Sequence, residues 1–430
     1  MRVLVIGSGG REHAIVWKFR QNLAKHEVFC APGNGGIELD ATIVPIPAIR
    51  IEELSQFVKK ERIDLTVVGP EQPLVDGIVD RFEKDGLKIF GPSKAAARLE
   101  GSKVFAKNFM QRHGIPTARF KDFSSKEKEQ AKEYARGMMA PVVVKADGLA
   151  AGKGVIVCKS ADEAEAAIDA LTSSKEFGQA GERIVVEECL RGEEVSVFVL
   201  TDGERHALLP PAQDHKRIFD GDLGKNTGGM GAYAPAPVLT KKLSARVERE
   251  IVVPTLRGMR DEGSGYRGCL YVGLMVTDEG PRVLEYNCRF GDPEAQVVIP
   301  LIEGEFGSLL LSIAERKFDP ARLRLRKAEC VCVVLASGGY PESYSSGKKI
   351  SGLDDFTSER DTIIFHAGTK RSGDILETAG GRVLGVTAIG EAGDLEATIR
   401  SAYRAVSGIS FDGMQYRTDI GKKALRLQHA

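Results

Sequence analysis

Short apolar runs alternate with amphipathic stretches along the first hundred residues. The runs are rich in β-branched residues and comprise Val3–Ile6, Val28–Cys30, Leu65–Val68 and Lys88–Phe90. Between two of these runs, Ile51–Glu61 has the pattern of a helix. This alternation is typical of βαβ units, which build an open and mostly parallel sheet. We therefore predict an N-terminal doubly wound parallel-sheet domain of the α/β class over residues 1–101.

The pattern changes near Gly101. Helices are expected at Lys103–His113, Ser124–Met138 and Ala161–Leu171, and strands at Val142–Lys145, Val155–Cys158, Ile184–Glu188 and Val195–Leu200. Most of these elements predict a small two-layer α+β unit, which we interpret as a lid over about residues 122–192. Strands return at Leu270–Val276 and Arg282–Asn287. A central domain is therefore expected to span residues 102–325.

The last part of the chain, residues 326–430, mixes strands with one long helix. The strands are expected at Cys330–Leu335, Ile363–His366 and Val383–Ala388, and the helix at Leu395–Val406. This region is expected to form a small, separate C-terminal α/β domain. Earlier in the chain, Asp214–Tyr233 is rich in glycine and has little apolar periodicity. We expect a long loop there, and such loops are usually functional or disordered.

Composition and charge argue against several classes of partner and location. Hydrophobic residues make up 42% of the 430 residues, and 60 basic residues balance 60 acidic ones, which argues against a general nucleic-acid partner. The apolar runs are far shorter than the roughly 20 residues of a membrane span. The N-terminus lacks a signal-peptide pattern, so a cytoplasmic location and no membrane partner are expected. The 7 cysteines include no C-x-x-C pair and are expected to be reduced thiols.

The glycine-rich turn Gly7–Gly10 follows the first strand and can be compared with a dinucleotide fingerprint. The third glycine of that fingerprint is replaced by Glu12, and the second strand ends at Cys30–Pro32 without the acidic residue that binds ribose. One interpretation is a tight strand-to-helix turn. The preferred one is a site for a small phosphorylated or aminated ligand, formed by Arg11, Glu12 and, at the neighbouring strand end, Glu71.

A second glycine-rich segment, Gly148–Gly154, has one spacer residue fewer than a P-loop, and Gly154 stands where a P-loop has Ser or Thr. It lies between two strands that are expected to be antiparallel. We interpret it as a flap whose backbone N–H groups can close over phosphates. Lys145 ends the first of these strands, where its ammonium group suits a phosphate. The alternative for Lys145 is a solvated lysine at a strand end.

Two charged segments are ambiguous from the residues alone. Glu187 and Glu188 close a strand, and neighbouring strand residues point to opposite faces, so at most one of them faces a given pocket. Asp214–Arg217 begins the glycine-rich segment. In isolation it is best interpreted as a solvated charge run.

The most informative segment is Leu284–Glu294. Glu285 and Asn287 are two residues apart on a predicted strand and so share one face, giving two oxygen donors suited to a hard divalent ion. Arg289 offers a planar fork for a carboxylate or a phosphate. Magnesium seldom has a full protein cage, so a nucleotide phosphate is expected to accompany it. The alternative is a surface strand and turn.

Several segments together resemble the ATP-grasp superfamily and, within it, the phosphoribosylamine–glycine ligases, also called glycinamide ribonucleotide synthetases, of purine biosynthesis. They are Val5–His13, Pro32–Gly36, Gly69–Glu71, Lys145–Gly154, Asp214–Lys216, Asn226–Gly231 and Arg289–Glu294. The resemblance covers essentially the whole chain. It implies a central ATP-grasp core carrying the inserted lid. It also implies ATP-dependent ligation of glycine to 5-phosphoribosylamine through glycyl phosphate, with release of ADP and phosphate.

The resemblance implies roles for particular residues, with ATP and Mg²⁺ or Mn²⁺ as cofactors. The ATP-binding candidates are Lys107, Lys145, Gly152, Lys153, Gly154, Glu187, Glu188, Leu190 and Glu194. The substrate-binding candidates are Gly9, Gly10, Arg11, Glu12, Glu71 and Arg382, and the catalytic candidates are Asp214, Lys216, Arg289 and Asp292. Glu285 and Asn287 are the metal candidates. Many relatives place a second carboxylate on the preceding strand, but Val272–Val276 contains no acidic residue.

The implied partners are two small-molecule substrates, glycine and 5-phosphoribosylamine, and the implied state is a monomer or a weak homo-oligomer. One alternative is another ATP-grasp carboxylate–amine ligase, such as a formate-using transformylase or a carboxylase of the biotin type. The segment Arg289–Glu294 argues against both. A nucleotide-binding sensor or scaffold without chemistry is a further alternative, against which Lys145, Glu285 and Asn287 argue.

Overall fold

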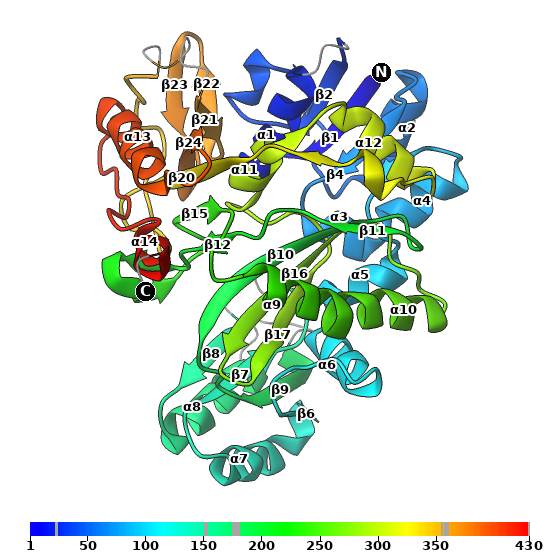
Figure 1. Ribbon diagram of the computed structural model, residues 1–430, viewed down its shortest axis with the longest axis vertical. Helices are drawn as coiled ribbons and strands as arrows, with labels where there is room; N and C mark the ends of the chain where they lie inside the picture. Colours follow the sequence, from blue (N-terminus) through cyan, green and yellow to red (C-terminus); the bar gives the residue numbers. More distant parts are fainter. Residues whose placement is uncertain (22–24, 150–153, 174–180, 354–355, 357–360, 429–430) are drawn as a thin grey trace.

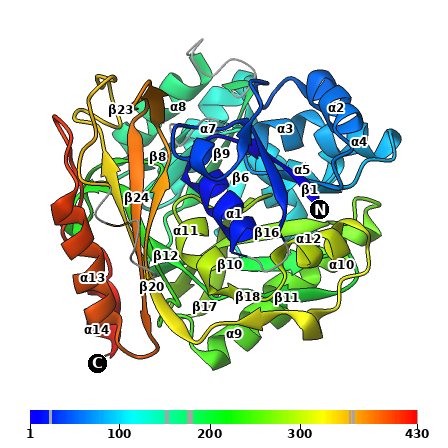
Figure 2. The same cartoon turned by 90° about the horizontal axis from the view of Figure 1, so that it is seen from above.

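The computed structural model describes residues 1–21, 25–149, 154–173, 181–353, 356 and 361–428. Four sheets dominate the molecule (Figure 1). The N-terminal sheet and the C-terminal sheet lie side by side at one end, and the lid sheet lies at the other end. The central sheet runs between them. Figure 2 shows helix α1 (Gly10–Arg20) between the N-terminal and C-terminal sheets.

The N-terminal sheet is parallel and has the order β3-β2-β1-β4-β5. Its strands are β1 (Arg2–Gly7), β2 (Glu27–Pro32), β3 (Thr42–Ile43), β4 (Leu65–Val68) and β5 (Ile89–Phe90). The other helices of this region are α2 (Ile51–Lys60), α3 (Glu71–Asp76), α4 (Ile78–Lys84) and α5 (Lys94–Gly101). Strand β4 is buried along its whole length, as expected of a strand covered by helices on both faces. The predicted βαβ arrangement is confirmed.

The lid is an antiparallel sheet with two helices and a core of its own. The sheet has the order β6-β9-β7-β8, with β6 (Phe120–Ser124), β7 (Val142–Ala146), β8 (Val155–Cys158) and β9 (Arg183–Glu188). Helices α7 (Lys128–Gly137) and α8 (Ala161–Ser173) pack on the sheet, and α6 (Lys103–Arg112) precedes it in the chain. The predicted pairing of the two strands that flank the glycine-rich flap is therefore correct.

The central sheet is antiparallel with the order β11-β10-β16-β17. Its strands are β10 (Glu193–Thr201), β11 (His206–Leu208), β16 (Gly268–Thr277) and β17 (Gly280–Asn287). Helices α9 (Lys241–Val247) and α10 (Val253–Asp261) precede β16, and α11 (Ala295–Val298) and α12 (Phe306–Ala314) follow β17. On β17, Tyr286 is buried, whereas Glu285 and Asn287 on either side of it are only half-buried. The strand therefore presents both predicted metal ligands on one face.

The C-terminal sheet has the order β12-β15-β20-β24-β21. Its main strands are β20 (Ala328–Ala336), β21 (Thr362–His366) and β24 (Arg382–Glu391), and its helices are α13 (Leu395–Gly408) and α14 (Lys422–Gln428). Two separate antiparallel strand pairs are also present. They are β18 (Ile302–Glu303) with β19 (Arg324–Leu325), and β22 (Thr369–Ser372) with β23 (Ile375–Thr378). This sheet is less separate than expected, because two of its strands come from residues 213–234.

The expectation of a long loop over Asp214–Tyr233 was wrong. The segment contains β12 (Gln213–Asp214), β13 (Arg217–Phe219), β14 (Leu223–Asn226) and β15 (Gly231–Ala234). Strands β13 and β14 form a hairpin, and β15 pairs with β20. Strand β14 is exposed along its whole length, so it carries no apolar alternation from which a strand could have been predicted.

Two further findings bear on the expectations from composition. All seven cysteines are free thiols. Within the ranges that the structure describes, none of the helices combines the length and the apolar character needed to cross a membrane.

Candidate active site

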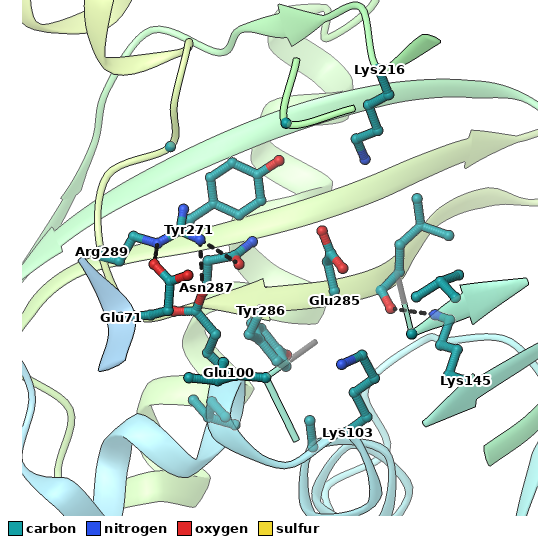
Figure 3. Close-up of a pocket in the computed structure, with 18 of the residues that line it drawn as sticks. Glu71, Glu100, Lys103, Lys145, Lys216, Tyr271, Glu285, Tyr286, Asn287 and Arg289 are labelled. Atoms are coloured by element: carbon teal, nitrogen blue, oxygen red, sulfur yellow. Dashed lines mark hydrogen bonds and ion pairs between the residues drawn. The ribbon is translucent and has the colours of Figure 1, made fainter. Parts of the chain in front are cut away.

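A cavity of about 320 Å³ opens between the central sheet, the lid and the end of helix α5. Among its lining residues are these predicted ones: Glu71, Lys107, Lys145, Gly154, Asp214, Lys216, Glu285, Asn287, Arg289 and Asp292. Figure 3 shows Glu285 with Lys216 on one side and Lys103 and Lys145 on the other. The structure therefore brings together segments that are more than two hundred residues apart in the sequence.

Two buried lysines of the cavity share one buried carboxylate. Lys107 Nζ on α6 and Lys145 Nζ on β7 each lie 2.5 Å from an oxygen of Glu187 on β9. Burial lowers the pKa of Lys107 to about 8, although Glu187 acts to raise it. Burial acts to raise the pKa of Glu187, but the two lysines lower it on balance. Glu187 thus remains ionised and holds both ammonium groups at the cavity wall.

Lys103, one helical turn before Lys107, also lines the cavity and was not predicted. Its Nζ donates to the carbonyl oxygen of Gly148 at 2.7 Å. Asp147 accepts hydrogen bonds from Ser102 Oγ and from the backbone N–H of Val104, which caps the start of α6. The first residues of the predicted flap are therefore fixed to this helix. Lysines at i and i+4 after a Ser N-cap share one helix face, which was the available sequence signal.

The predicted metal ligands lie at the centre of the cavity. Burial acts to raise the pKa of Glu285, but Lys216, Lys145 and Lys103 lower it on balance, so its carboxylate is ionised. Asn287 Oδ1 accepts a hydrogen bond from Arg289 at 3.3 Å. Among the described residues there is no group of three or more His, Cys, Asp or Glu suited to a metal ion. Glu285 and Asn287 supply two hard oxygen donors. Such a small set suits an ion that a nucleotide phosphate helps to hold.

The segment Asp214–Lys216 turns its charges into the cavity, so its interpretation as a solvated charge run is wrong. Lys216 Nζ lies 2.7 Å from Glu194 Oε2. Burial acts to lower the pKa of Lys216, but Glu194 and Asp214 raise it well above its usual range. Burial raises the pKa of Asp214 to about 7 against the effect of Lys216. His215, which lies between Asp214 and Lys216 directly after the two-residue strand β12, is buried.

Arg289 is held by protein groups on several sides. Its Nη2 donates to Glu100 at 2.8 Å and to Asn287 Oδ1, and its Nε donates to Glu71 at 3.2 Å. Its Nη1 donates to the carbonyl oxygen of Phe290. Glu100, at the end of α5, also accepts from the backbone N–H of Cys288 at 2.7 Å. One of the five guanidinium N–H groups is left without a described protein partner.

Asp292 lies between the cavity and the C-terminal sheet. Its carboxylate lies 3.2 Å from Nη2 of Arg382 and accepts from Gln296 at 2.8 Å. Arg382 Nη1 also donates to the carbonyl oxygens of Asp292 and Gly228. Burial acts to raise the pKa of Asp292, but Arg382 and Arg11 lower it on balance. The predicted residues Asp292 and Arg382 are therefore direct partners.

The predicted residues of the first turn lie beside the cavity and are absent from its lining. Glu12 Oε2 accepts from the backbone N–H of Gly9 at 2.6 Å, and Glu12 Oε1 lies 2.5 Å from Arg11 Nε. Glycines make room for this buried carboxylate, since a Cβ at Gly69 would lie 1.9 Å from Glu12 Oε1. A Cβ at Gly9 would lie 3.2 Å from Asp292 Oδ2, which places the start of α1 next to that carboxylate. Gly10 begins the same helix.

The remaining predicted ATP residues lie at the end of strand β9 or outside the described residues. Glu188 is half-buried and pairs with Arg119 at 3.0 Å, on the face of β9 opposite to Glu187. Leu190 is half-buried after the end of β9. Gly152 and Lys153 belong to residues 150–153, outside the described residues.

The cavity residues without an assigned role in the sequence analysis include Glu100, Lys103, Tyr271 and Glu294. Ser196 Oγ on β10 lies 2.9 Å from the Tyr271 hydroxyl and 3.1 Å from Glu294 Oε1. These contacts join β10, β16 and the turn after β17. Apart from the lysine spacing described above, local sequence gives no signal for them, because each depends on tertiary contacts.

Known families match the chain along nearly its full length. Residues 101–295 match "Phosphoribosylglycinamide synthetase, ATP-grasp (A) domain", residues 1–100 match the N domain of that synthetase, and residues 330–423 match its C domain. The chain is 49% identical over 429 residues to the phosphoribosylamine–glycine ligase of Chlorobaculum tepidum, covering 99% of this chain and 100% of the relative. The chain belongs to this ligase family.

Solved structures agree with this assignment. The crystal structure of the phosphoribosylamine–glycine ligase of Thermotoga maritima matches with a TM-score of 0.83 and 36% identity, over 97% of this chain and 100% of that one. A biotin carboxylase of Campylobacter jejuni matches with a TM-score of 0.74 and 16% identity, over 100% of this chain and 95% of that chain. The second match shows a common fold only. The predicted family, fold class and glycine ligase activity in purine biosynthesis are thereby confirmed, together with the use of ATP.

Proposed function

We propose that this ligase joins the carboxylate of glycine to the amine of 5-phosphoribosylamine, with ATP converted to ADP and phosphate through glycyl phosphate. The observation that carries the proposal is the composition of the single cavity described above. One part of it is lined by lysines suited to phosphates, and the other by the guanidinium group of Arg289 with the carboxylates of Glu71 and Asp292. A carboxylate and a triphosphate can therefore meet beside Glu285.

The lysines are proposed to hold the nucleotide phosphates. Lys107 and Lys145 keep a fixed separation because Glu187 lies between them, and fixed charges stabilise a transferring phosphoryl group without reorganisation. The phosphates are proposed to be covered by Gly152, Lys153 and Gly154. The nucleotide is also proposed to contact Glu188, Leu190 and Glu194, near the end of β9 and the start of β10. Closure of the lid limits the access of water, to which an acyl phosphate is reactive.

Glu285 and Asn287 are proposed to bind Mg²⁺ or Mn²⁺ together with the nucleotide. When bound, such an ion neutralises charge on the transferring phosphate and orients it. Lys216 lies on the opposite side of Glu285 from Lys103 and Lys145, so it can contact the same phosphate from the other direction. Asp214, which burial keeps close to its protonation midpoint at pH 7, is proposed as a partner of Lys216 in that position.

Arg289 is proposed to hold the glycine carboxylate for in-line attack on the γ-phosphate. Asp292 and Glu71 are proposed to orient the amine of 5-phosphoribosylamine, and Arg382, with Gly9, Gly10, Arg11 and Glu12 near it, to receive the phosphorylated ribose. A monomer or weak homo-oligomer in the cytoplasm completes the proposal.

The test is ADP release on mixing the protein with Mg²⁺, ATP, glycine and freshly made 5-phosphoribosylamine. Release is expected only when both glycine and the amine are present. Glycine labelled with ¹⁸O in its carboxylate should transfer label to inorganic phosphate, because one carboxylate oxygen leaves with the phosphate. Equal ADP release when formate or bicarbonate replaces glycine would instead support one of the other ATP-grasp ligases.

A further inference from the structure

Arg417, after helix α13, is a completely buried guanidinium group far from the cavity in sequence. Its side chain is 0% exposed. Its Nε and Nη2 donate to the two oxygens of Asp419, each at 2.7 Å, and its Nη1 donates to Asp222 at 2.8 Å and to the carbonyl oxygen of Arg217 at 3.1 Å. A buried charge with this many partners fixes the position of everything that it touches.

These partners connect the C-terminal segment to the β13–β14 hairpin. Asp222 lies at the hairpin tip, where it also pairs with Lys423, and the backbone N–H of Gly221 donates to Asp419 at 2.8 Å. At the same tip, Asp220 accepts a hydrogen bond from the backbone N–H of Thr418 at 2.8 Å. We call residues 417–423 with their contacts to the hairpin tip the C-terminal clamp.

The hairpin tip has a conformation that depends on outside contacts. Asp222 has φ 56° and Gly221 has φ 68°, so two successive residues adopt the left-handed region. That region is unfavourable for Asp by comparison with Gly. Conformations of this kind persist where surrounding contacts determine them, and the C-terminal clamp supplies those contacts.

The base of the same hairpin forms part of the cavity wall. Lys216 directly precedes β13, and its carbonyl oxygen accepts hydrogen bonds from the backbone N–H and from Oγ1 of Thr227 at 2.8 and 2.9 Å. Asn226, Thr227 and Gly228 line the cavity together with Lys216. The hairpin is therefore fixed at its tip by the C-terminal clamp and faces the nucleotide site with its base.

Between the clamp and the cavity lies His215, whose two ring nitrogens are buried without a hydrogen-bond partner among the described residues. Burial lowers the pKa of His215 to about 4, and the charges of Arg417 and Lys423 act in the same direction. A neutral ring gives no direct ionic support to Lys216. The position of Lys216 on this side therefore depends on the hairpin backbone.

We propose that Arg417 is a positioning residue that fixes Lys216 in the active site by holding the β13–β14 hairpin. The catalytic consequence rests on the proposed function, whereas the mechanical coupling does not. Removal of the guanidinium takes both Arg417 donors from Asp419, leaves Asp222 with its pair to Lys423, and releases the tip. The base then loses its fixed register, and the ion pair of Lys216 with Glu194 does not by itself fix the lysine.

The experiment uses Arg417→Ala, with Arg404→Ala as the matched control, since Arg404 is exposed on α13. Hydrogen exchange of residues 217–226, followed by mass spectrometry, is expected to be at least about tenfold faster in Arg417→Ala, because local opening then requires breaking fewer buried contacts. Exchange in the lid is expected to be unchanged. If Arg417→Ala does not fold, the surface pair Thr418→Ala with Asp220→Asn weakens the same clamp without removing the buried charge.

A double-mutant cycle then tests the link to Lys216. Arg417→Ala is expected to lower kcat/KM for ATP by at least about tenfold in the wild-type background and by less than about twofold in a Lys216→Met background, because the two changes affect one unit. Guanidinium at non-denaturing concentrations should restore activity to Arg417→Ala and leave Arg404→Ala unchanged.

Unchanged exchange of residues 217–226 would overturn the clamp, and equal losses in the two backgrounds would overturn its link to Lys216. If the wild-type protein released no ADP with glycine and 5-phosphoribosylamine, the proposed function would fail, and hydrogen exchange of the hairpin alone would decide the clamp.

Discussion

The charge of Lys107 is expected to make ATP binding sensitive to alkaline pH. Burial lowers the pKa of Lys107 to about 8, and its ammonium group lines the cavity beside Lys145. If the charged form is required, the apparent Kd for ATP scales with one plus the ratio of neutral to charged lysine. With a pKa of about 8, that factor rises from about 1.3 at pH 7.5 to about 33 at pH 9.5, so the Kd is expected to increase about 25-fold.

The assay is titration calorimetry of a non-hydrolysable ATP analogue with Mg²⁺ over this pH range at constant ionic strength. Glu187→Gln supplies the decisive variant. Glu187 raises the pKa of Lys107 through its charge, so its neutralisation should move the loss of affinity to lower pH. Lys18→Met is the matched control, because burial also lowers the pKa of Lys18 to about 8 but Lys18 lies on α1, outside the cavity lining.

As pH rises, the contribution of Lys107 to the free energy of unfolding changes in the opposite direction to the affinity for ATP. Effects on binding can therefore be separated from effects on stability. The pKa of Lys107 is lower in the folded chain than its usual 10.5, so the unfolded chain binds more protons between pH 8 and 10.5. The contribution of Lys107 to the free energy of unfolding therefore rises with pH in that window. Weaker ATP binding at pH 9.5 cannot result from unfolding caused by this group. A Kd that stays constant from pH 7.5 to 9.5 would refute the reasoning. So would a Glu187→Gln variant that loses affinity for the ATP analogue at the same pH as the wild type.

Three further changes test other parts of the site and fold. Glu285→Ala should abolish magnesium-dependent turnover while the thermal unfolding midpoint changes little; activity equal to that of the wild type across a magnesium titration would contradict a metal-binding role. Arg382→Ala should raise the KM for 5-phosphoribosylamine by about tenfold or more without a similar change for glycine, as expected when one charge-assisted phosphate contact is lost. Gly69→Ala should lower the free energy of unfolding by about 1–3 kcal/mol, because its methyl group would meet the Glu12 carboxylate, whereas Gly137→Ala, with open space around it, should be close to neutral in thermal unfolding.

Sequence patterns predicted the elements in which side-chain burial is uniform along the element. Strand β4 is buried on both faces and its sequence is apolar and β-branched, so Leu65–Val68 was predicted with its observed bounds. The two-residue strand β3 was missed, since a pair such as Thr42–Ile43 has no measurable alternation. The hairpin around Gly221 was missed for a related reason, because Ile218 is its one buried apolar side chain and the C-terminal clamp and backbone pairing hold the rest.

The shared direction of two candidate metal ligands was predictable, because both lie on one short element. Glu285 and Asn287 follow from strand alternation alone, and the structure places both on one face of β17. The inward direction of Asp214 and Lys216 could not be obtained in this way, because β12 is only two residues long and its orientation depends on β15 and β20. Glu100 was not predictable at all, since its role depends on contacts with Cys288 and Arg289 from a distant strand.

The donors of Arg289 place a condition on how glycine can bind. Four of its five N–H groups are taken by Glu71, Glu100, Asn287 and the Phe290 carbonyl, so a carboxylate that binds through two parallel hydrogen bonds must displace one of them. Glu100 is buried and has further partners, whereas the Glu71 side chain is 33% exposed and lies 3.2 Å from Nε. The parallel donor pairs of a guanidinium group are Nε with Nη2 and Nη1 with Nη2, and the N–H without a described partner is on Nη1. The contact that such a carboxylate replaces at the lowest cost is therefore the one of 3.3 Å between Nη2 and Asn287 Oδ1. The amide oxygen of Asn287 is then released for its proposed role in metal binding, so in this arrangement the binding of glycine would prepare a contact for the divalent ion.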